Sequence, residues 1–146
     1  MSDPYESLRL DNQLCFPLYA CAKEIVRQYR APLSRLHLTY TQYVVMMVLW
    51  EHGTMTEGEL GKRVHLDSGT LAPLLKRLES LGYILRTRPE GNERTLSLSL
   101  TEAGEGLRDE ALSVPEAMAG CLNLTPLEMA QLKSLLDKAL SRMPRQ

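Results

Sequence analysis

A cysteine near the predicted start of a long helix is the residue of this sequence best suited to redox chemistry. Pro17 lacks a backbone N–H and fits without cost only in the first turn of a helix, which places the helix start between Asn12 and Phe16. Cys15 then lies where the helix dipole and unpaired N–H groups favour a thiolate. A thiolate is the form that attacks peroxides. The alternative is that Cys15 is a small buried apolar residue.

Phenol groups gather around the same predicted helix. Four of the six tyrosines lie in or near it, namely Tyr19, Tyr29, Tyr40 and Tyr43. Phenols that donate hydrogen bonds to a thiolate would hold it charged. The alternative is that these rings are buried at an interface.

The other two cysteines have different surroundings. Cys21 follows Cys15 by six residues, so on a helix it is about 9 Å further along the axis and on another face. These two cannot readily form a disulfide, and we expect Cys21 in the core. Cys121 falls in a predicted loop. The sequence has no C-x₂-C pair and its three histidines lack ligand spacing, so we predict neither a metal nor a cofactor.

Residues 56–100 have the pattern of a winged helix-turn-helix. Thr56 and Glu59 form a capping box that begins a short helix, and residues 66–69 make a turn. A second helix follows and ends at Gly82. Its apolar residues repeat at helical spacing and are Leu71, Leu74, Leu75, Leu78 and Leu81.

Two short strands are predicted after this helix, at residues 84–88 and 95–100, with a turn at 89–92. Strict alternation places Leu96, Leu98 and Leu100 on one face of the hairpin. A helix, a turn, a helix and a hairpin in this order put the second helix into the DNA major groove.

Polar and basic side chains mark the surface that would meet DNA. The first turn of the second helix meets phosphates and base edges, and an arginine on the wing can enter the minor groove. The predicted DNA-binding residues are Ser68, Thr70, Lys76, Arg77, Arg86, Arg88 and Arg94. Residues 62–94 contain seven Lys or Arg against four Asp or Glu, whereas the whole chain has a formal charge of −1. A basic edge on an acidic body favours double-stranded DNA as a partner.

The remaining sequence predicts long helices at both ends of one domain. Residues 1–11 look like a loosely docked arm, and a helix from Cys15 to about Arg30 ends at Pro32. Thr41 is a candidate cap for the next helix. Another helix runs from Thr101 to about Val114. A last one begins with a capping box at residues 125–128 and carries an apolar stripe made of Leu132, Leu135, Leu136, Ala139, Leu140 and Met143. Apolar helices at both ends of a small domain favour a homodimer.

Composition narrows the class of protein. The 146 residues are 44% hydrophobic, which excludes disorder and suffices for a core. No apolar run approaches the ~20 residues of a membrane span, and the acidic, polar N-terminus is unlike a secretory signal. We therefore expect a cytoplasmic protein that does not interact with membranes.

The order of these elements resembles the MarR family of dimeric bacterial regulators over essentially the whole chain. Four segments resemble the organic hydroperoxide resistance regulators (OhrR) within it: residues 10–19 (LDNQLCFPLY), 38–43 (LTYTQY), 65–71 (HLDSGTL) and 73–76 (PLLK). The resemblance implies a mainly α fold with a small β-wing. It divides residues 1–146 into dimerisation helices at 1–35 and 102–146 and a winged helix-turn-helix at 54–100.

The resemblance also implies a mechanism. Cys15 would be the peroxide-sensing cysteine, and Tyr29 and Tyr40 of the opposing subunit would hydrogen-bond its sulfur in the reduced state. The reduced dimer would repress a gene, and organic hydroperoxides would release it from its operator. Cys121 lies near the resolving cysteine of two-cysteine members. The wing departs from the family, because Asn92 replaces the Asp of the usual Asp-x-Arg that orients Arg94.

Three other functions are compatible with parts of the sequence. A MarR-type regulator that responds to a non-covalent small aromatic ligand would not need Cys15. A cysteine-dependent peroxidase would not need a DNA-binding module, and we predict that the chain is not an enzyme. A constitutive DNA-binding protein would keep its cysteines inert in the core.

Overall fold

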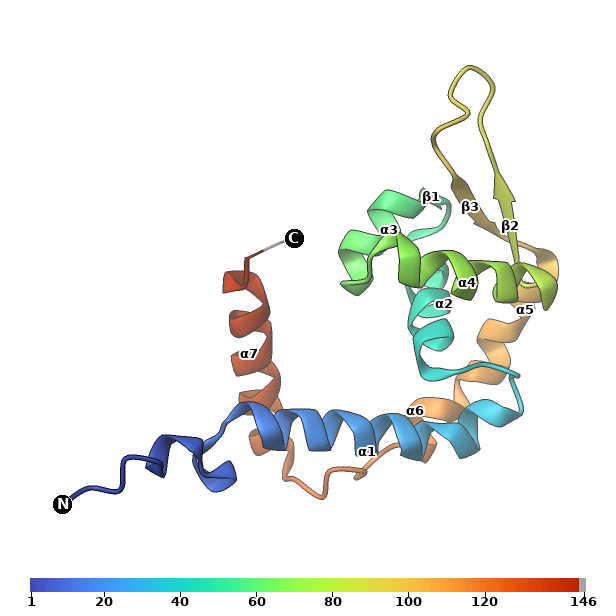
Figure 1. Ribbon diagram of the computed structural model, residues 1–146. Helices are drawn as coiled ribbons and strands as arrows, with labels where there is room; N and C mark the ends of the chain where they lie inside the picture. Colours follow the sequence, from blue (N-terminus) through green and yellow to red (C-terminus); the bar gives the residue numbers. More distant parts are fainter. Residues whose placement is uncertain (145–146) are drawn as a thin grey trace.

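The computed structural model describes residues 1–144 and confirms a mainly helical fold with a small sheet (Figure 1). Two short 3₁₀ turns, Glu6–Leu8 and Leu10–Asn12, come first. The helices are α1 (Cys15–Ser34), α2 (Tyr40–His52), α3 (Glu57–Val64), α4 (Ser68–Ser80), α5 (Glu102–Ala111), α6 (Ser113–Ala117) and α7 (Pro126–Arg142). The strands are β1 (Met55–Thr56), β2 (Ile84–Thr87) and β3 (Ser97–Leu100).

Local capping signals define α3 and α4, as predicted. The Thr56 hydroxyl accepts a hydrogen bond from the Glu59 amide at 3.2 Å, and the Glu59 carboxylate accepts one from the Thr56 amide at 2.9 Å. Asp67 caps α4 by accepting from the Thr70 amide at 2.7 Å. Gly82 follows the end of α4 with φ of +82°, a conformation that glycine adopts without strain.

The hairpin belongs to a sheet of three antiparallel strands in the order β1-β3-β2. Leu98 is completely buried, and Leu96 and Leu100 pack against the core beside it, which confirms the predicted alternation. The sequence did not predict β1, because two residues are too short to show an alternating pattern.

Two helix ends near the N-terminal half differ from the predictions. α1 does not end before Pro32 but continues to Ser34, because burying Leu33 completely in the core outweighs one missing hydrogen bond in the last turn. Thr41 does not cap α2; Thr39 does. Its hydroxyl accepts from the Gln42 amide, and the Gln42 side chain accepts from the Thr39 amide at 3.0 Å.

The helix predicted from Thr101 to Val114 is divided in two. α5 ends at Ala111 and α6 begins at Ser113, with Pro115 inside the first turn of α6. A proline ring clashes with the carbonyl four residues before it, which is that of Ala111, so the break lies before Pro115 rather than at it.

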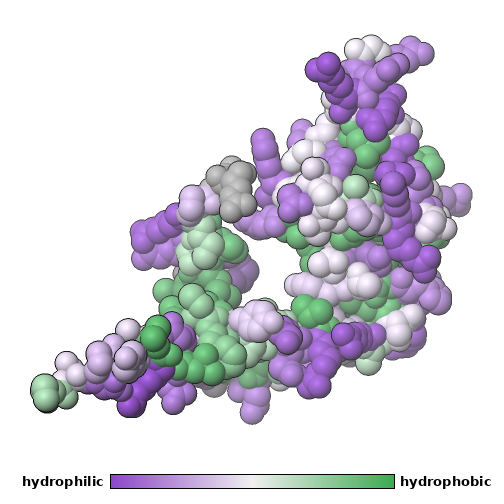
Figure 2. Space-filling view, in the orientation of Figure 1, coloured by the Kyte–Doolittle hydropathy of each residue, from purple (hydrophilic) through white to green (hydrophobic). Residues whose placement is uncertain are grey.

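The core lies between the winged helix-turn-helix, α2, the end of α1 and the α5–α6 segment. In contrast, α7 has no buried residue, and Leu33 is the only buried residue of α1. Figure 2 shows hydrophobic residues exposed over α7 and over the N-terminal half of α1, while the wing tip is hydrophilic. None of the helices within residues 1–144 is long and apolar enough to cross a bilayer.

Gly104 joins α5 to the base of the wing and gives a test of this packing. A Cβ at this position would collide with the Tyr83 carbonyl oxygen and would lie 3.3 Å from Leu100 Cδ2. The Gly104 carbonyl also accepts a hydrogen bond from Trp50 Nε1 at 2.9 Å, which ties α5 to α2. We expect Gly104→Ala to lower the free energy of unfolding by about 2–3 kcal/mol, measured by urea denaturation at fixed protein concentration.

Gly106→Ala is the matched control in the same helix. A Cβ at this position would point into open space, so this change is expected to stabilise α5 by about 0.5–1 kcal/mol. Equal stability of the two variants would contradict the close approach at Gly104.

Candidate functional site

Cys15 is the first residue of α1, and its side chain is exposed. Leu14, which precedes it, makes no side-chain capping hydrogen bond, so the first-turn N–H groups have no side-chain acceptor from the N-cap. Tyr19 lies one turn later on the same side of the helix, and the Lys23 ammonium is 5.2 Å from the centre of its ring. The sulfur is therefore accessible and lies at the positive end of a helix dipole.

The phenol cluster lies at the other end of α1. The ring centres of Tyr29 and Tyr40 are 4.7 Å apart, and those of Tyr29 and Tyr43 are 5.9 Å apart. Burial, and then the neighbouring Tyr40, Tyr43 and Cys121, raise the pKa of Tyr29. Burial and Tyr40 also raise the pKa of Tyr43. A phenol with a raised pKa stays protonated at neutral pH, so Tyr29 and Tyr43 are hydrogen-bond donors there.

Cys15 and Tyr29 of one chain do not meet. Fourteen residues of α-helix separate them, which corresponds to roughly 21 Å along the axis. Tyr29 and Tyr40, by contrast, are brought together by α1 and α2. The phenols therefore do not form a site with the Cys15 of their own chain.

Cys121 lies beside the phenol cluster rather than beside Cys15. It is half-buried in the turn after α6, packs on the core, and lies near enough to Tyr29 to help raise the pKa of that phenol. Cys21 is exposed on α1, so the expectation that it belongs to the core is wrong. The residues next to it on α1, from Cys21 to Glu24, are all exposed.

The first turn of α4 and the outer side of that helix present the predicted polar and basic groups. Ser68, Thr70, Lys76 and Arg77 are all exposed. Asp67 is committed to the cap, and its hydrogen bond from the Thr70 amide lowers the pKa of its carboxyl group. The exposed face of α4 can therefore approach a polyanion without unpairing buried groups.

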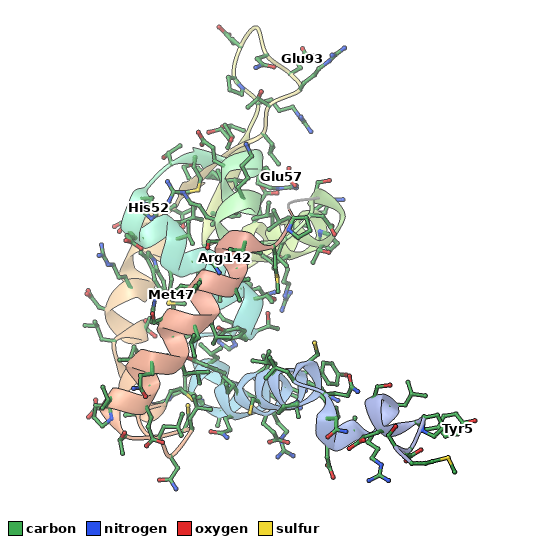
Figure 3. The ribbon with its side chains drawn as sticks, turned by 90° about the vertical axis from the view of Figure 1, so that its left-hand side faces the viewer. Tyr5, Met47, His52, Glu57, Glu93 and Arg142 are labelled. Carbon is green, nitrogen blue, oxygen red and sulfur yellow. The ribbon has the colours of Figure 1, made fainter. Side chains whose placement is uncertain are left out.

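The three wing arginines have different environments. Arg86 lies within β2 and is paired with Glu79 of α4, whereas Arg88 donates from Nη1 to the Glu93 carbonyl at 2.7 Å. Figure 3 shows Glu93 at the far end of the hairpin from the helices. Arg94 is exposed and makes no hydrogen bond or ion pair to another described residue. Sequence reasoning missed the Glu79 and Glu93 contacts, because a side-chain partner seven or five residues away has no sequence signal.

Among residues 1–144, no three His, Cys, Asp or Glu side chains gather as a metal site would require. The groups on which a function could rest are the exposed Cys15 thiol, a group of phenols, the Cys121 thiol near Tyr29 and a basic edge.

Comparison with known proteins relates this arrangement to regulators. Residues 38–96 match the model of the MarR family. The chain is 43% identical over 143 residues to the organic hydroperoxide resistance transcriptional regulator of Bacillus subtilis (strain 168), covering 98% of this chain and 97% of that protein.

Two solved structures of AbfR of Staphylococcus epidermidis are also similar, at 34% identity. The reduced form bound to DNA gives a TM-score of 0.76, with 93% of this chain and 94% of that chain covered. The disulfide form gives a TM-score of 0.64, with 92% and 95% covered. The 43% identity over nearly the full length and the shared fold show that the chain belongs to the MarR family of transcriptional regulators.

Proposed function

We propose that this chain is a peroxide-sensing transcriptional repressor whose reduced homodimer binds operator DNA and is released when organic hydroperoxides oxidise Cys15. It is a regulator and not an enzyme, in keeping with its family. The similarity to a regulator of organic hydroperoxide resistance supports this function. Its partners are then a second copy of the chain and double-stranded DNA, and we expect it in the cytoplasm with that DNA.

The observation that carries the proposal is the separation of the exposed thiol from the phenols along α1. Leu18, Ala22, Ile25 and Tyr29 recur at the spacing of a packing face on this largely uncovered helix. If two copies of α1 cross antiparallel about Ala22, Cys15 of each chain lies opposite the partner's Tyr29. A second copy would therefore complete the site twice, once at each end of the crossing.

The first chemical step is a two-electron oxidation of sulfur. The Cys15 thiolate attacks the distal oxygen of the hydroperoxide, the S–O bond forms, and the O–O bond breaks. The distal oxygen keeps its hydrogen, so Cys15 becomes a sulfenic acid directly, and the alkoxide leaves and takes up one proton to become an alcohol. The new S–OH group needs more space and different hydrogen bonds, so the contacts with the partner's Tyr29 and the partner's Tyr40 break.

The second step involves Cys121, whose place beside Tyr29 supports a role as the resolving thiol. The partner's Cys121 attacks the Cys15 sulfenic acid, the S–S bond forms, and the oxygen leaves as water. We predict that peroxide-treated wild type runs as a linked dimer on a non-reducing gel, whereas Cys121→Ser runs as a monomer. A linked dimer that persists in Cys121→Ser would remove this cysteine from the mechanism.

DNA release follows if the linked dimer holds the two α4 helices at the wrong separation. The two half-sites of a dimer lie about one DNA turn apart, so a shift of the dimer helices changes the fit of both α4 helices.

The test measures binding of a duplex that the protein itself selects from a randomised pool. Fluorescence anisotropy before and after equimolar cumene hydroperoxide is expected to show a 5- to 150-fold loss of affinity, which corresponds to about 1–3 kcal/mol of coupling. Dithiothreitol should restore binding. Unchanged affinity after oxidation would contradict the proposal.

A regulator of non-covalent aromatic ligands is the second candidate, favoured by one surface feature. An open recess of about 220 Å³ between α2 and α5 is lined in part by Tyr43 and Trp50, whose rings suit an aromatic ligand, and by the oppositely charged Arg108 and Glu51. The recess is smaller than the ~300 Å³ or more of typical ligand sites. Release of the same duplex by an aromatic acid, in the absence of any peroxide, would favour this alternative.

A further inference from the structure

Arg86 and Glu79 join the wing to the recognition helix α4. The Arg86 amide donates to Glu79 Oε2 at 3.2 Å, and Arg86 Nη2 donates to Glu79 Oε1 at 3.1 Å. Both carboxylate oxygens are therefore used by one residue. The hydrogen bond from the Arg86 side chain lowers the pKa of Glu79, so the pair is charged at neutral pH.

The guanidinium of Arg86 is directed into the protein rather than toward solvent. Its side chain is 22% exposed, and its Nε is buried without a hydrogen-bond partner among the described residues. A buried N–H without a partner destabilises the folded state, so placing Arg86 beside Glu79 costs some folding free energy. A phosphate would have to take this guanidinium away from the carboxylate.

The pair lies at the point where the hairpin leaves the core. Arg86 is opposite Leu98, which is completely buried, and Thr87 opposite Ser97 is the last pair of the strand ladder. Beyond it, the hairpin is held by hydrogen bonds such as that from Arg88 to the Glu93 carbonyl. The direction of the wing tip therefore depends on how β2 is fixed to α4.

We propose that Glu79 and Arg86 are positioning residues that set the angle between the wing and α4, and that Arg86 does not contact DNA. This inference rests on the proposed DNA-binding function. The pair holds Arg94, the exposed arginine at the wing tip, at the distance from α4 that lets it reach the minor groove while α4 lies in the major groove. Arg86 is thereby removed from the predicted DNA contacts.

The test compares Arg86→Met, Glu79→Ala and Arg94→Met in binding the selected duplex over a range of salt concentrations. A residue that contacts phosphate contributes about 1 to the slope of log affinity against log salt. We expect Arg86→Met and Glu79→Ala each to weaken binding about tenfold and to lower the slope by no more than Arg94→Met does, because a displaced wing loses only the Arg94 contact. Arg94→Met should weaken binding and lower the slope. Adding Arg94→Met to Arg86→Met should reduce the affinity for DNA much less than adding it to the wild type, because the wing of Arg86→Met is already displaced.

Two results would overturn the inference. One is a slope that is lower by about 1 more in the Arg86→Met, Arg94→Met double variant than in Arg94→Met alone, which identifies a direct phosphate contact by Arg86. The other is wild-type or tighter binding by Glu79→Ala, because freeing Arg86 would then help rather than harm. Thermal unfolding checks that each variant is folded. If Glu79→Ala unfolds, Glu79→Gln replaces it, because the glutamine side chain keeps one acceptor. Glu79→Gln should lose less affinity for the duplex than Arg86→Met does. Failure of the peroxide response in wild type would leave this comparison intact, so the two failures are distinguishable.

Discussion

Replacing Cys15 with serine is expected to leave the protein bound to its operator at hydroperoxide concentrations that release the wild type. A serine hydroxyl is not ionised at neutral pH and does not attack the peroxide O–O bond, so no sulfenic acid forms. We expect the 5- to 150-fold loss of affinity seen in wild type to disappear in this variant. Affinity before oxidation should stay close to wild type, because the serine hydroxyl can also accept hydrogen bonds from phenols. Fluorescence anisotropy with the selected duplex measures both values.

Cys21→Ser is the matched control, because Cys21 is exposed on the same helix. It should release DNA like the wild type. If Cys15→Ser still releases, or if Cys21→Ser fails to release, the sensing sulfur has been assigned to the wrong residue. Mass spectrometry of the oxidised wild type would then locate the modified thiol.

A charge placed in the apolar stripe of α7 is expected to separate the dimer. Leu136 lies in the middle of a helix that has no buried residue, and Leu135, Leu140 and Met143 are exposed nearby. In an isolated chain Leu136→Glu would remain at the surface, but in a dimer it would bury an unpaired carboxylate. Two linked DNA-binding units gain on the order of 100-fold or more over one, so the monomer should lose at least that much affinity for a two-half-site operator.

Sedimentation equilibrium measures the oligomeric state, and anisotropy measures the affinity. Ser134→Glu is the control on the opposite side of α7, where 200° of helix rotation separates it from position 136. It should remain a dimer with wild-type affinity. A dimer that survives Leu136→Glu, or one that Ser134→Glu breaks equally, would show that α7 contributes to dimerisation through another face or not at all.

The correct predictions about the fold depend on signals within a few residues. The spacing of Thr56 and Glu59 is enough to predict the capping box. The alternation around Leu98 is enough to predict that this residue lies on the buried face of the hairpin. The Thr39 cap could have been found in the same way, because Thr39 and Gln42 have the spacing of a capping box that Thr41 lacks. Such elements are predictable because their free energy comes from neighbours in sequence.

The wrong predictions depend on contacts between distant residues. Strand β1 exists only because β3 pairs with it, and α1 passes Pro32 because Leu33 is buried against other elements. Cys21 is small and apolar, which favoured burial, but exposure depends on which elements cover α1. The pairing of Arg86 with Glu79 also depends on the fold of the chain at Gly82 and was not foreseen, while DNA contact by Arg86 was only a prediction.

The sequence by itself determined the helix-turn-helix, the hairpin and the place of Cys15 at a helix start, because caps, periodicity and proline act locally. The tertiary structure decided that Tyr29 packs on Tyr40 and lies near Cys121 but far from its own Cys15, and that Arg86 pairs with Glu79 of α4 while Arg94 stays exposed. These arrangements depend on how α1, α2 and the wing pack, and packing is fixed by the burial of side chains from the whole chain at once.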